Sequence, residues 1–320
     1  MSDRAFPLTL DADALLAHID ALHDDEPQQA LELLRALDMA ALSTARLPRL
    51  SFLLDHVLGE KFDLWAEALA GQHVVVQRAG AQATQAIFRH AAIAAQFVGD
   101  VDLVRAWTQA LAASSDAPIA KARALVSLGA VQFSVSRLGA EAAGRLVLPA
   151  LEPLAALRAS PGAGLDAAFG AVTNNLASEL LERPHLDDFA QPDLRSALQL
   201  CTGHAQAFWE LAGTWLNRER AHYLCAMTAN VLGQGEQGIA QARAGLALLD
   251  EFDPAGAENV DRAFLELELA TALRLADEAG RAQALARALT LSSQFGEAWL
   301  DRWFAQRQTR NEALAAHYGR

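Results

Sequence analysis

The sequence predicts an all-α protein built as a solenoid of stacked antiparallel helix hairpins. The chain of 320 residues is 52% hydrophobic and contains only 2 tyrosines. Alanine and leucine, which favour helices, dominate over the aromatic and β-branched residues that favour strands. Gly59, Gly99 and Gly139 follow one another at a constant interval of 40 residues, and Gly233 and Gly280 mark similar turns later. A period of this length is typical of stacked hairpins, none of which can bury its apolar face alone.

The first half of the chain accommodates four hairpins. Asp11 can cap the first predicted helix, and Pro27 suits the first turn of the second. Gly59 breaks the second hairpin, and Gly99 and Gly139 provide the turns of the third and fourth. The segment 71–80 contains a strand-like valine run, but without a partner strand it is better explained as helix or linker. The predicted pairs are 11–23 with 26–37, 43–58 with 61–70, 81–98 with 101–113, and two helices on either side of Gly139.

The second half begins after Pro161-Gly162-Ala163-Gly164, the strongest helix breaker in the chain. We therefore expect N-terminal helical repeats in 1–160 and C-terminal repeats with a capping helix in 161–320, together forming one continuous superhelix. A helix starting at residue 165 should end before Pro184, because proline disfavours helical geometry in the preceding residue. The remaining predicted helices are 193–213, 218–232, 235–250, 258–278, 280–294 and a closing helix 297–317.

The closing helix carries Trp299, Trp303 and Phe304. We expect these aromatic side chains to cap the last repeat; if exposed, they would instead form a homodimer interface. A compact helical bundle is the alternative architecture. A bundle would share the amphipathic helices, but it would not require turns at equal intervals.

The net charge limits the kinds of partner that the protein can bind, and the cysteine content indicates its cellular compartment. The net charge is −13, so binding to a nucleic-acid backbone is not expected. No apolar stretch is long enough for a membrane span, and the N-terminus does not resemble a signal peptide. Cys201 and Cys225 indicate a reduced, cytoplasmic protein in which each is a small buried residue. Lys61 and Lys121 are the only lysines, an arginine bias associated with GC-rich bacterial genomes.

The recurring small-large-small pattern resembles the tetratricopeptide-repeat family. Ala205-Trp209-Ala212 matches the second-helix signature of these repeats, and Leu103-Trp107-Ala110 and Ala143-Val147-Ala150 match it in part. The resemblance covers about residues 11–295. The period exceeds the usual ~34 residues, as in divergent long-hairpin forms such as kinesin light chains. The resemblance implies a right-handed superhelix whose concave groove binds peptides or proteins.

Two segments are candidates for that groove. Thr173–Ala177 resembles the Asn-Leu-Ala segment with which kinesin-light-chain-like repeats contact a peptide backbone, which implicates Asn174 and Asn175. Residues 204–223 gather aromatic and charged side chains in an otherwise plain Ala/Leu chain. In the structural alternative Trp209 belongs to the core and the charges form a solvated helix start. The predicted binding residues are Asn174, Asn175, Trp215, Asn217, Arg218, Glu219, Arg220 and Tyr223.

No metal site, cofactor or catalytic residue is predicted. His18 and His23 lie five residues apart and so do not share a helix face. His23-Asp24 resembles a dipeptide of metal-dependent phosphohydrolases, but no supporting His and Asp series can be placed beside it. We therefore expect a non-catalytic protein that binds a peptide or protein partner. The alternatives are a domain that senses a small molecule or peptide, a scaffold without a discrete pocket, and an enzyme.

Overall fold

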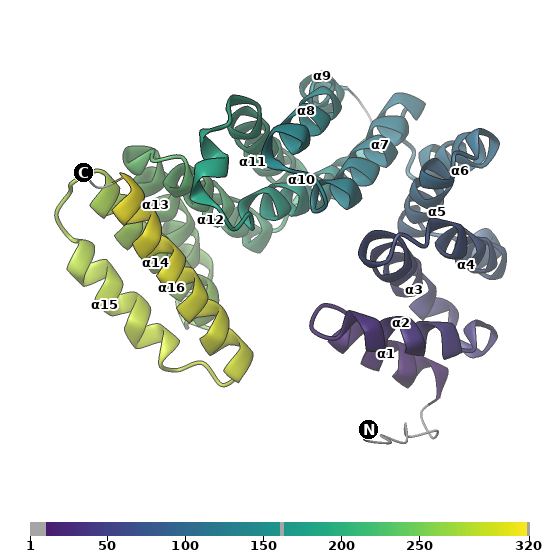
Figure 1. Ribbon diagram of the computed structural model, residues 1–320, viewed down its shortest axis with the longest axis horizontal. Helices are drawn as coiled ribbons and strands as arrows, with labels where there is room; N and C mark the ends of the chain where they lie inside the picture. Colours follow the sequence, from purple (N-terminus) through teal and green to yellow (C-terminus); the bar gives the residue numbers. More distant parts are fainter. Residues whose placement is uncertain (1–10, 161–162, 319–320) are drawn as a thin grey trace. The chain divides into compact units, whose positions relative to one another are not determined.

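A computed structural model of the chain describes residues 11–160 and 163–318, and every element within these ranges is helical (Figure 1). The all-α prediction is confirmed. Helices pack mainly against their neighbours in sequence order. The chain forms two compact units that divide between Ser134 and Val135.

The N-terminal unit contains helices of ordinary length and one π-helical segment. Pro48 lies in the first turn of α3, where its missing amide hydrogen costs no intrahelical hydrogen bond. The segment 71–80, ambiguous in the sequence, belongs to α4 almost entirely. The elements are α1 (Ala12–Leu22), α2 (Pro27–Ala36), α3 (Leu47–Leu53), the π-helix Leu54–Lys61, α4 (Trp65–Ala79), α5 (Gln85–Val98), α6 (Val101–Ser114) and α7 (Ile119–Val135), with 3-10 turns at Met39–Ala41, Thr44–Arg46 and Gly80–Gln82.

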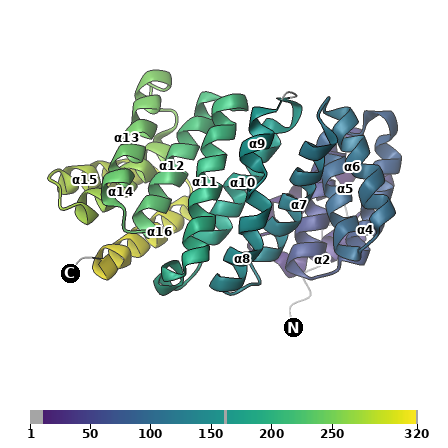
Figure 2. The same cartoon turned by 90° about the horizontal axis from the view of Figure 1, so that it is seen from above.

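The C-terminal unit is a succession of paired helices, and α10 to α13 follow one another side by side (Figure 2). The pairs are α10 with α11, α12 with α13, and α14 with α15. Helix α12 also packs against α10 and α14. The elements are α8 (Ala140–Leu151), α9 (Leu154–Ala159), α10 (Asp166–Leu181), α11 (Pro192–Ala212), α12 (Trp215–Val231), α13 (Gly235–Phe252), α14 (Asn259–Leu275), α15 (Arg281–Ser292) and α16 (Ala298–Tyr318), with 3-10 turns at Ala163–Leu165 and Leu186–Ala190.

Three of the predicted glycine turns have the backbone geometry that requires glycine. Gly99, Gly233 and Gly280 have φ of 81°, 73° and 102°, the left-handed region that side chains disfavour. Gly59 does not form the predicted turn, because it lies inside the π-helix. A Cβ at Gly59 would overlap the indole ring of Trp65, so glycine is needed there for packing rather than for chain reversal.

The boundary between the units differs from the one expected at residues 160 and 161. Helix α8 packs against α11 and belongs to the C-terminal unit, whereas α7 belongs to the N-terminal unit except for its last residue. The division therefore falls within the hairpin predicted around Gly139. Gly144 explains the close approach of α8 to α11, since a Cβ there would contact the backbone at Asp193 and Leu194. Pro161 and Gly162, which prompted the expected boundary, lie outside the described residues.

Helix α16 packs beside α14 rather than extending the row of pairs (Figure 1). Phe304 of α16 is buried in an aromatic cluster with Phe264 of α14, whose ring centroid lies 5.3 Å away. The predicted closing helix is therefore present, and Phe304 packs as expected. Trp299 and Trp303 remain about half exposed, at 50% and 45%.

Candidate binding groove in the C-terminal unit

A groove of about 1250 Å³ lies among α10, α12, α14 and α16. Helix α10 contributes Asn174 and α12 contributes Tyr223. Asp261 of α14 lines the groove, and Trp303 and Arg307 line it from α16. The groove thus collects side chains that are distant in sequence because α16 folds back onto the paired helices.

The α12–α14 side of the groove is acidic. Arg220 Nε donates a hydrogen bond to Asp261 Oδ2 at 3.0 Å. Glu219, next to Arg220 in sequence, is fully buried, and its oxygens accept no hydrogen bond. Burial, together with the nearby Asp261 carboxylate, raises the pKa of Glu219 to about 8. Glu219 is therefore mostly protonated at neutral pH, which reduces the repulsion between its carboxyl group and that of Asp261.

The α16 side of the groove is aromatic. Trp299 and Trp303 stack with ring centroids 6.3 Å apart. Trp303 also lies 4.3 Å from the ring centroid of Phe264, which belongs to the buried cluster beneath. Trp303 is thus supported by the core and Trp299 by Trp303, and both half-exposed rings line the groove, an arrangement suited to aliphatic or cationic side chains.

A buried polar network holds α16 in place. Glu268 of α14 accepts hydrogen bonds from Arg307 Nε at 2.7 Å and from Asn311 Nδ2 at 3.0 Å. Asn230 Nδ2 of α12 donates to the other oxygen of Glu268 at 2.7 Å. At the end of α16, the Tyr318 hydroxyl donates to the Val231 carbonyl at 2.7 Å. These contacts make α16 a fixed wall of the groove.

The structure brings together some of the predicted binding residues and separates others. Asn174, Arg220 and Tyr223 line the groove, and Glu219 is buried beside Asp261. Tyr223 is half-buried and its hydroxyl oxygen is buried without a partner; burial raises the pKa of that hydroxyl, so it stays protonated. Asn175 is exposed and does not line the groove.

The other three predicted residues lie elsewhere. Trp215 stacks on Phe252 with ring centroids 5.7 Å apart, and so packs α12 against α13. Asn217 forms a capping box with Thr214 at the start of α12, where each side chain bonds the other's backbone amide. Arg218 is half-buried and lies outside the groove lining.

The predicted burial of the two cysteines is confirmed. Cys201 and Cys225 are both free and buried. Burial raises the pKa of both thiols, to about 12 for Cys225, so neither supplies a thiolate at neutral pH. Trp209 packs over Gly170 of α10, where a Cβ would contact the indole, which agrees with the core alternative.

Sequence reasoning missed Asp261 and Arg307 altogether. It also assigned Trp299 and Trp303 to capping rather than to a binding surface. An available signal was Glu258 followed three residues later by Asp261, which places two acids on one face at the start of α14. Arg307 gave no such signal, because its role depends on a partner, Glu268, that lies 39 residues away.

Comparisons with known proteins do not extend this description. No protein-family model matches the chain, and no curated protein matches it in sequence. Among the described residues, no helix is both long and apolar enough to cross a lipid bilayer. A functional assignment therefore depends on the geometry of the chain itself.

Proposed function

We propose that the C-terminal unit binds a segment of a protein partner that presents a basic side chain among apolar ones. The observation that carries this proposal is the groove itself, in which acidic side chains of α14 face half-exposed tryptophans of α16. The ordered helix pairs support a tetratricopeptide-like solenoid, an architecture whose grooves bind extended or helical segments.

The size of the groove favours a polypeptide over a small molecule. Pockets for small molecules usually have volumes of about 300–1000 Å³ and enclose most of the ligand. The groove here measures about 1250 Å³ and draws its lining from four helices and the segment after α10. A peptide of several residues fills such a space, whereas a single metabolite would contact only part of it.

The charges in the groove favour a basic segment. The arginines that line it are already engaged: Arg220 with Asp261, Arg307 with Glu268, and Arg310 with the Leu181 carbonyl. Glu258 also lines the groove and has no cationic partner among the described residues. A cationic side chain that approached Glu258 and Asp261 would also favour the ionised form of Glu219, because its charge would offset part of the burial and repulsion that raise the pKa of Glu219.

A random peptide library displayed on phage tests this proposal directly. We expect the purified protein to select peptides that carry Lys or Arg flanked by aliphatic or aromatic residues. The affinity of one selected peptide is then measured by fluorescence anisotropy against variants of the groove. Trp303→Ala and Glu258→Gln should each weaken binding by about tenfold or more, since each removes a direct contact.

Asn174 and Asn175 form a matched pair within one helix. Asn174→Ala should weaken binding, whereas Asn175→Ala, at an exposed position outside the groove lining, should leave it unchanged. Equal effects of the two substitutions would contradict a site in this groove.

Arg220→Ala distinguishes a basic from an acidic ligand by the sign of its effect. If the ligand is basic, removal of Arg220 frees Asp261 and strengthens binding. If Arg220 instead receives a carboxylate of the partner, the same substitution weakens binding. Selection of acidic peptides, or weaker binding by Arg220→Ala, would overturn the proposal.

A further inference from the structure

A second cluster of side chains lies in the N-terminal unit, separate from any residue of the groove. His23 follows the last residue of α1, and Asp24 stands in the turn before α2. His56 lies in the π-helix Leu54–Lys61 and reaches the same turn, where its Nε2 contacts Asp24. π-Helical turns are rare and are frequently found at functional sites.

The ligand atoms of this cluster have the spacing that a metal ion requires. One atom from each of His23, Asp24 and His56 can be chosen so that all three lie within 4.8 Å of one another. His56 Nε2 is 3.2 Å from Asp24 Oδ1, and His23 Nε2 is 3.4 Å from Asp24 Oδ2. Ligands of a tetrahedral zinc ion, at about 2.0–2.1 Å from the metal, are about 3.3 Å apart. The three side chains would therefore have to move only slightly to place their ligand atoms around an ion.

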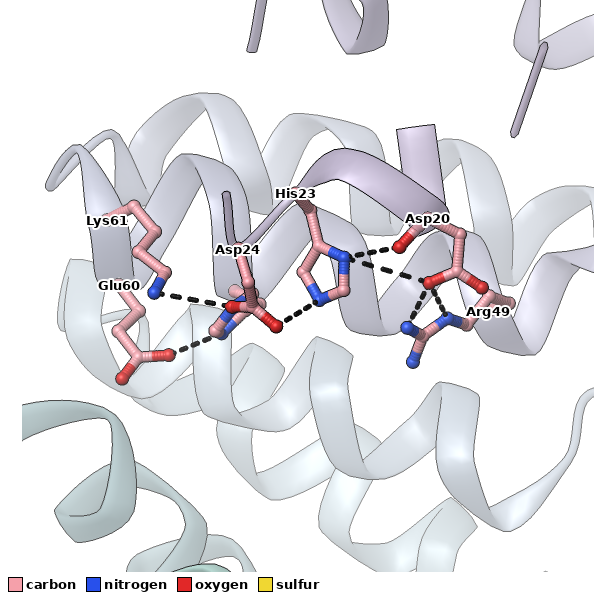
Figure 3. Close-up of polar contacts among 7 residues, drawn as sticks. Asp20, His23, Asp24, Arg49, Glu60 and Lys61 are labelled. Carbon is pink, nitrogen blue, oxygen red and sulfur yellow. Dashed lines mark hydrogen bonds and ion pairs between the residues drawn. The ribbon is translucent and has the colours of Figure 1, made fainter. Parts of the chain in front are cut away.

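Both imidazole rings are held in the orientation of metal ligands. His23 Nδ1 donates to the Asp20 carbonyl at 2.6 Å, and His56 Nδ1 lies 2.6 Å from Glu60 Oε2 (Figure 3). A carbonyl or a carboxylate only accepts, so each Nδ1 carries a proton. Without a metal, His56 Nε2 donates to Asp24 Oδ1 by the same rule, and a bound ion would replace that proton and take the Nε2 lone pair. Metal-bound histidines use this arrangement, with the second nitrogen bonded to a carbonyl or carboxylate.

Aromatic packing further restricts the rings. Phe52 stacks on His56 with ring centroids 5.2 Å apart and meets the edge of His23 at 6.1 Å. The Arg49 guanidinium covers Phe52 at 4.4 Å, and it also pairs with Asp20. The side chain of Asp24, in contrast, is 68% exposed, which leaves the remaining coordination positions open to water.

We propose that His23, Asp24 and His56 bind one divalent transition-metal ion, with zinc as the best-fitting species. Two imidazoles and one carboxylate suit Zn²⁺, Fe²⁺, Co²⁺ or Ni²⁺, whereas Mg²⁺ and Ca²⁺ prefer sites built entirely from oxygen. The ion would join the turn after α1 to the π-helix, 32 residues further along the chain. The sequence alone gave no such prediction, because nothing in it places His56 beside His23-Asp24.

Lys61 provides a competing charge. Its ammonium lies 3.5 Å from Asp24 Oδ1 and would have to move away when an ion binds. Repulsion between Lys61 and the ion lowers the affinity of the site. Lys61→Gln should therefore bind the metal more tightly than the wild type.

The experiment is a titration of the chelator-treated, full-length protein with Co²⁺, followed by its ligand-field absorption, and with Zn²⁺, followed by calorimetry. We expect one saturable site that Mg²⁺ does not compete for. Asp24→Asn, an exposed position that the fold tolerates, and His56→Gln should each weaken binding more than about 100-fold. Glu60→Gln, which affects only the orientation of His56, should weaken it by about 10–100-fold.

His18→Gln is the matched control. His18 is an exposed residue of α1, the helix that His23 follows, and it lies outside the cluster. The control should bind the metal as the wild type does, and circular dichroism of each metal-free variant should confirm the native helix content. Absence of saturable binding would overturn the proposal. So would affinities of Asp24→Asn and His56→Gln equal to that of the wild type, or a loss in His18→Gln as large as that in Asp24→Asn.

Discussion

Each unit buries a carboxyl group within a hydrogen-bonded network, but the two networks treat its charge differently. In the N-terminal unit, Asp55 accepts from Gln72 Nε2 at 2.7 Å and lies 3.0 Å from His90 Nδ1. Burial raises the pKa of Asp55 well above its ordinary value and lowers that of His90 well below. These shifts favour the uncharged form of both side chains, although the charge of nearby Arg89 opposes the shift of Asp55. Arg89 only donates and lies 3.2 Å from His90 Nε2, so the neutral ring carries its proton on Nδ1 and donates it to Asp55.

In the C-terminal unit, the buried carboxylate has a permanent countercharge. Glu268 is fully buried and pairs with Arg307, which is 7% exposed. An arginine remains charged under all ordinary conditions, so this network cannot become neutral by moving a proton. The comparison shows two ways to accommodate a buried carboxyl group: protonation, or an ion pair with a charged side chain. Which of the two a unit uses determines how its stability responds to mutation.

The largest expected effect is at the ion pair. Arg307→Met should destabilise the C-terminal unit by about 3–5 kcal/mol, because Glu268 would be left buried without a countercharge. Denaturant unfolding followed by circular dichroism measures this loss. The double variant Glu268→Met/Arg307→Met should recover part of it, since apolar residues replace the two charges, although the buried amides of Asn230 and Asn311 lose their carboxylate acceptor. If the single and double variants were equally unstable, the ion pair would not be the source of the loss.

A second, smaller effect is expected at Glu219, a buried carboxyl group whose oxygens accept no hydrogen bond. Its pKa of about 8 exceeds the ordinary 4.5, so the folded chain holds a proton that the unfolded chain releases between these values. Stability consequently falls as the pH rises from about 4.5 to 8. Glu219→Gln should remove this dependence and stabilise the protein by on the order of 2–4 kcal/mol at pH 8. Melting temperatures at pH 5 and pH 8 test the prediction, and a constant difference between variant and wild type would contradict it.

The smallest effect is expected in the neutral network. Asp55→Asn stays uncharged but keeps an acceptor for only one of the two donors, Gln72 and His90, so it should lose about 0.5–1.5 kcal/mol of stability at pH 7. Asp55→Ala is the control, because it removes the acceptor of both Gln72 Nε2 and His90 Nδ1, at a cost of about 1–3 kcal/mol for each buried donor that loses its bond. A severe loss in Asp55→Asn would mean that Asp55 is ionised, and the contrast between the two units would fail.

The sequence predicts local features of the fold well. Gly99, Gly233 and Gly280 were recognisable because a chain reversal at each requires a backbone that only glycine adopts readily. Gly59 looked the same in the sequence but serves a different purpose, namely contact with Trp65. A periodic pattern cannot separate these two reasons for glycine, since one is a property of the backbone and the other of a neighbouring side chain.

The candidate sites were predictable only in part. Asn174, Arg220 and Tyr223 attracted attention as polar or aromatic residues in a plain background, and each lines the groove. Asn217 attracted attention for the same reason, yet it caps a helix. Residue type alone did not distinguish these roles. The wall formed by α16 depends on long-range packing, which no local pattern encodes.

The contact between Glu268 and Arg307 also has a consequence for the order in which the chain is made. During synthesis α14 emerges well before α16, so Glu268 is present before Arg307, the arginine that pairs with it. Until then its carboxylate keeps its water, and α14 cannot bury that face without a large desolvation cost. Completion of the C-terminal unit is thereby coupled to the arrival of its last helix, and a ribosome that stalls before Arg307 would release a chain whose final repeats stay open.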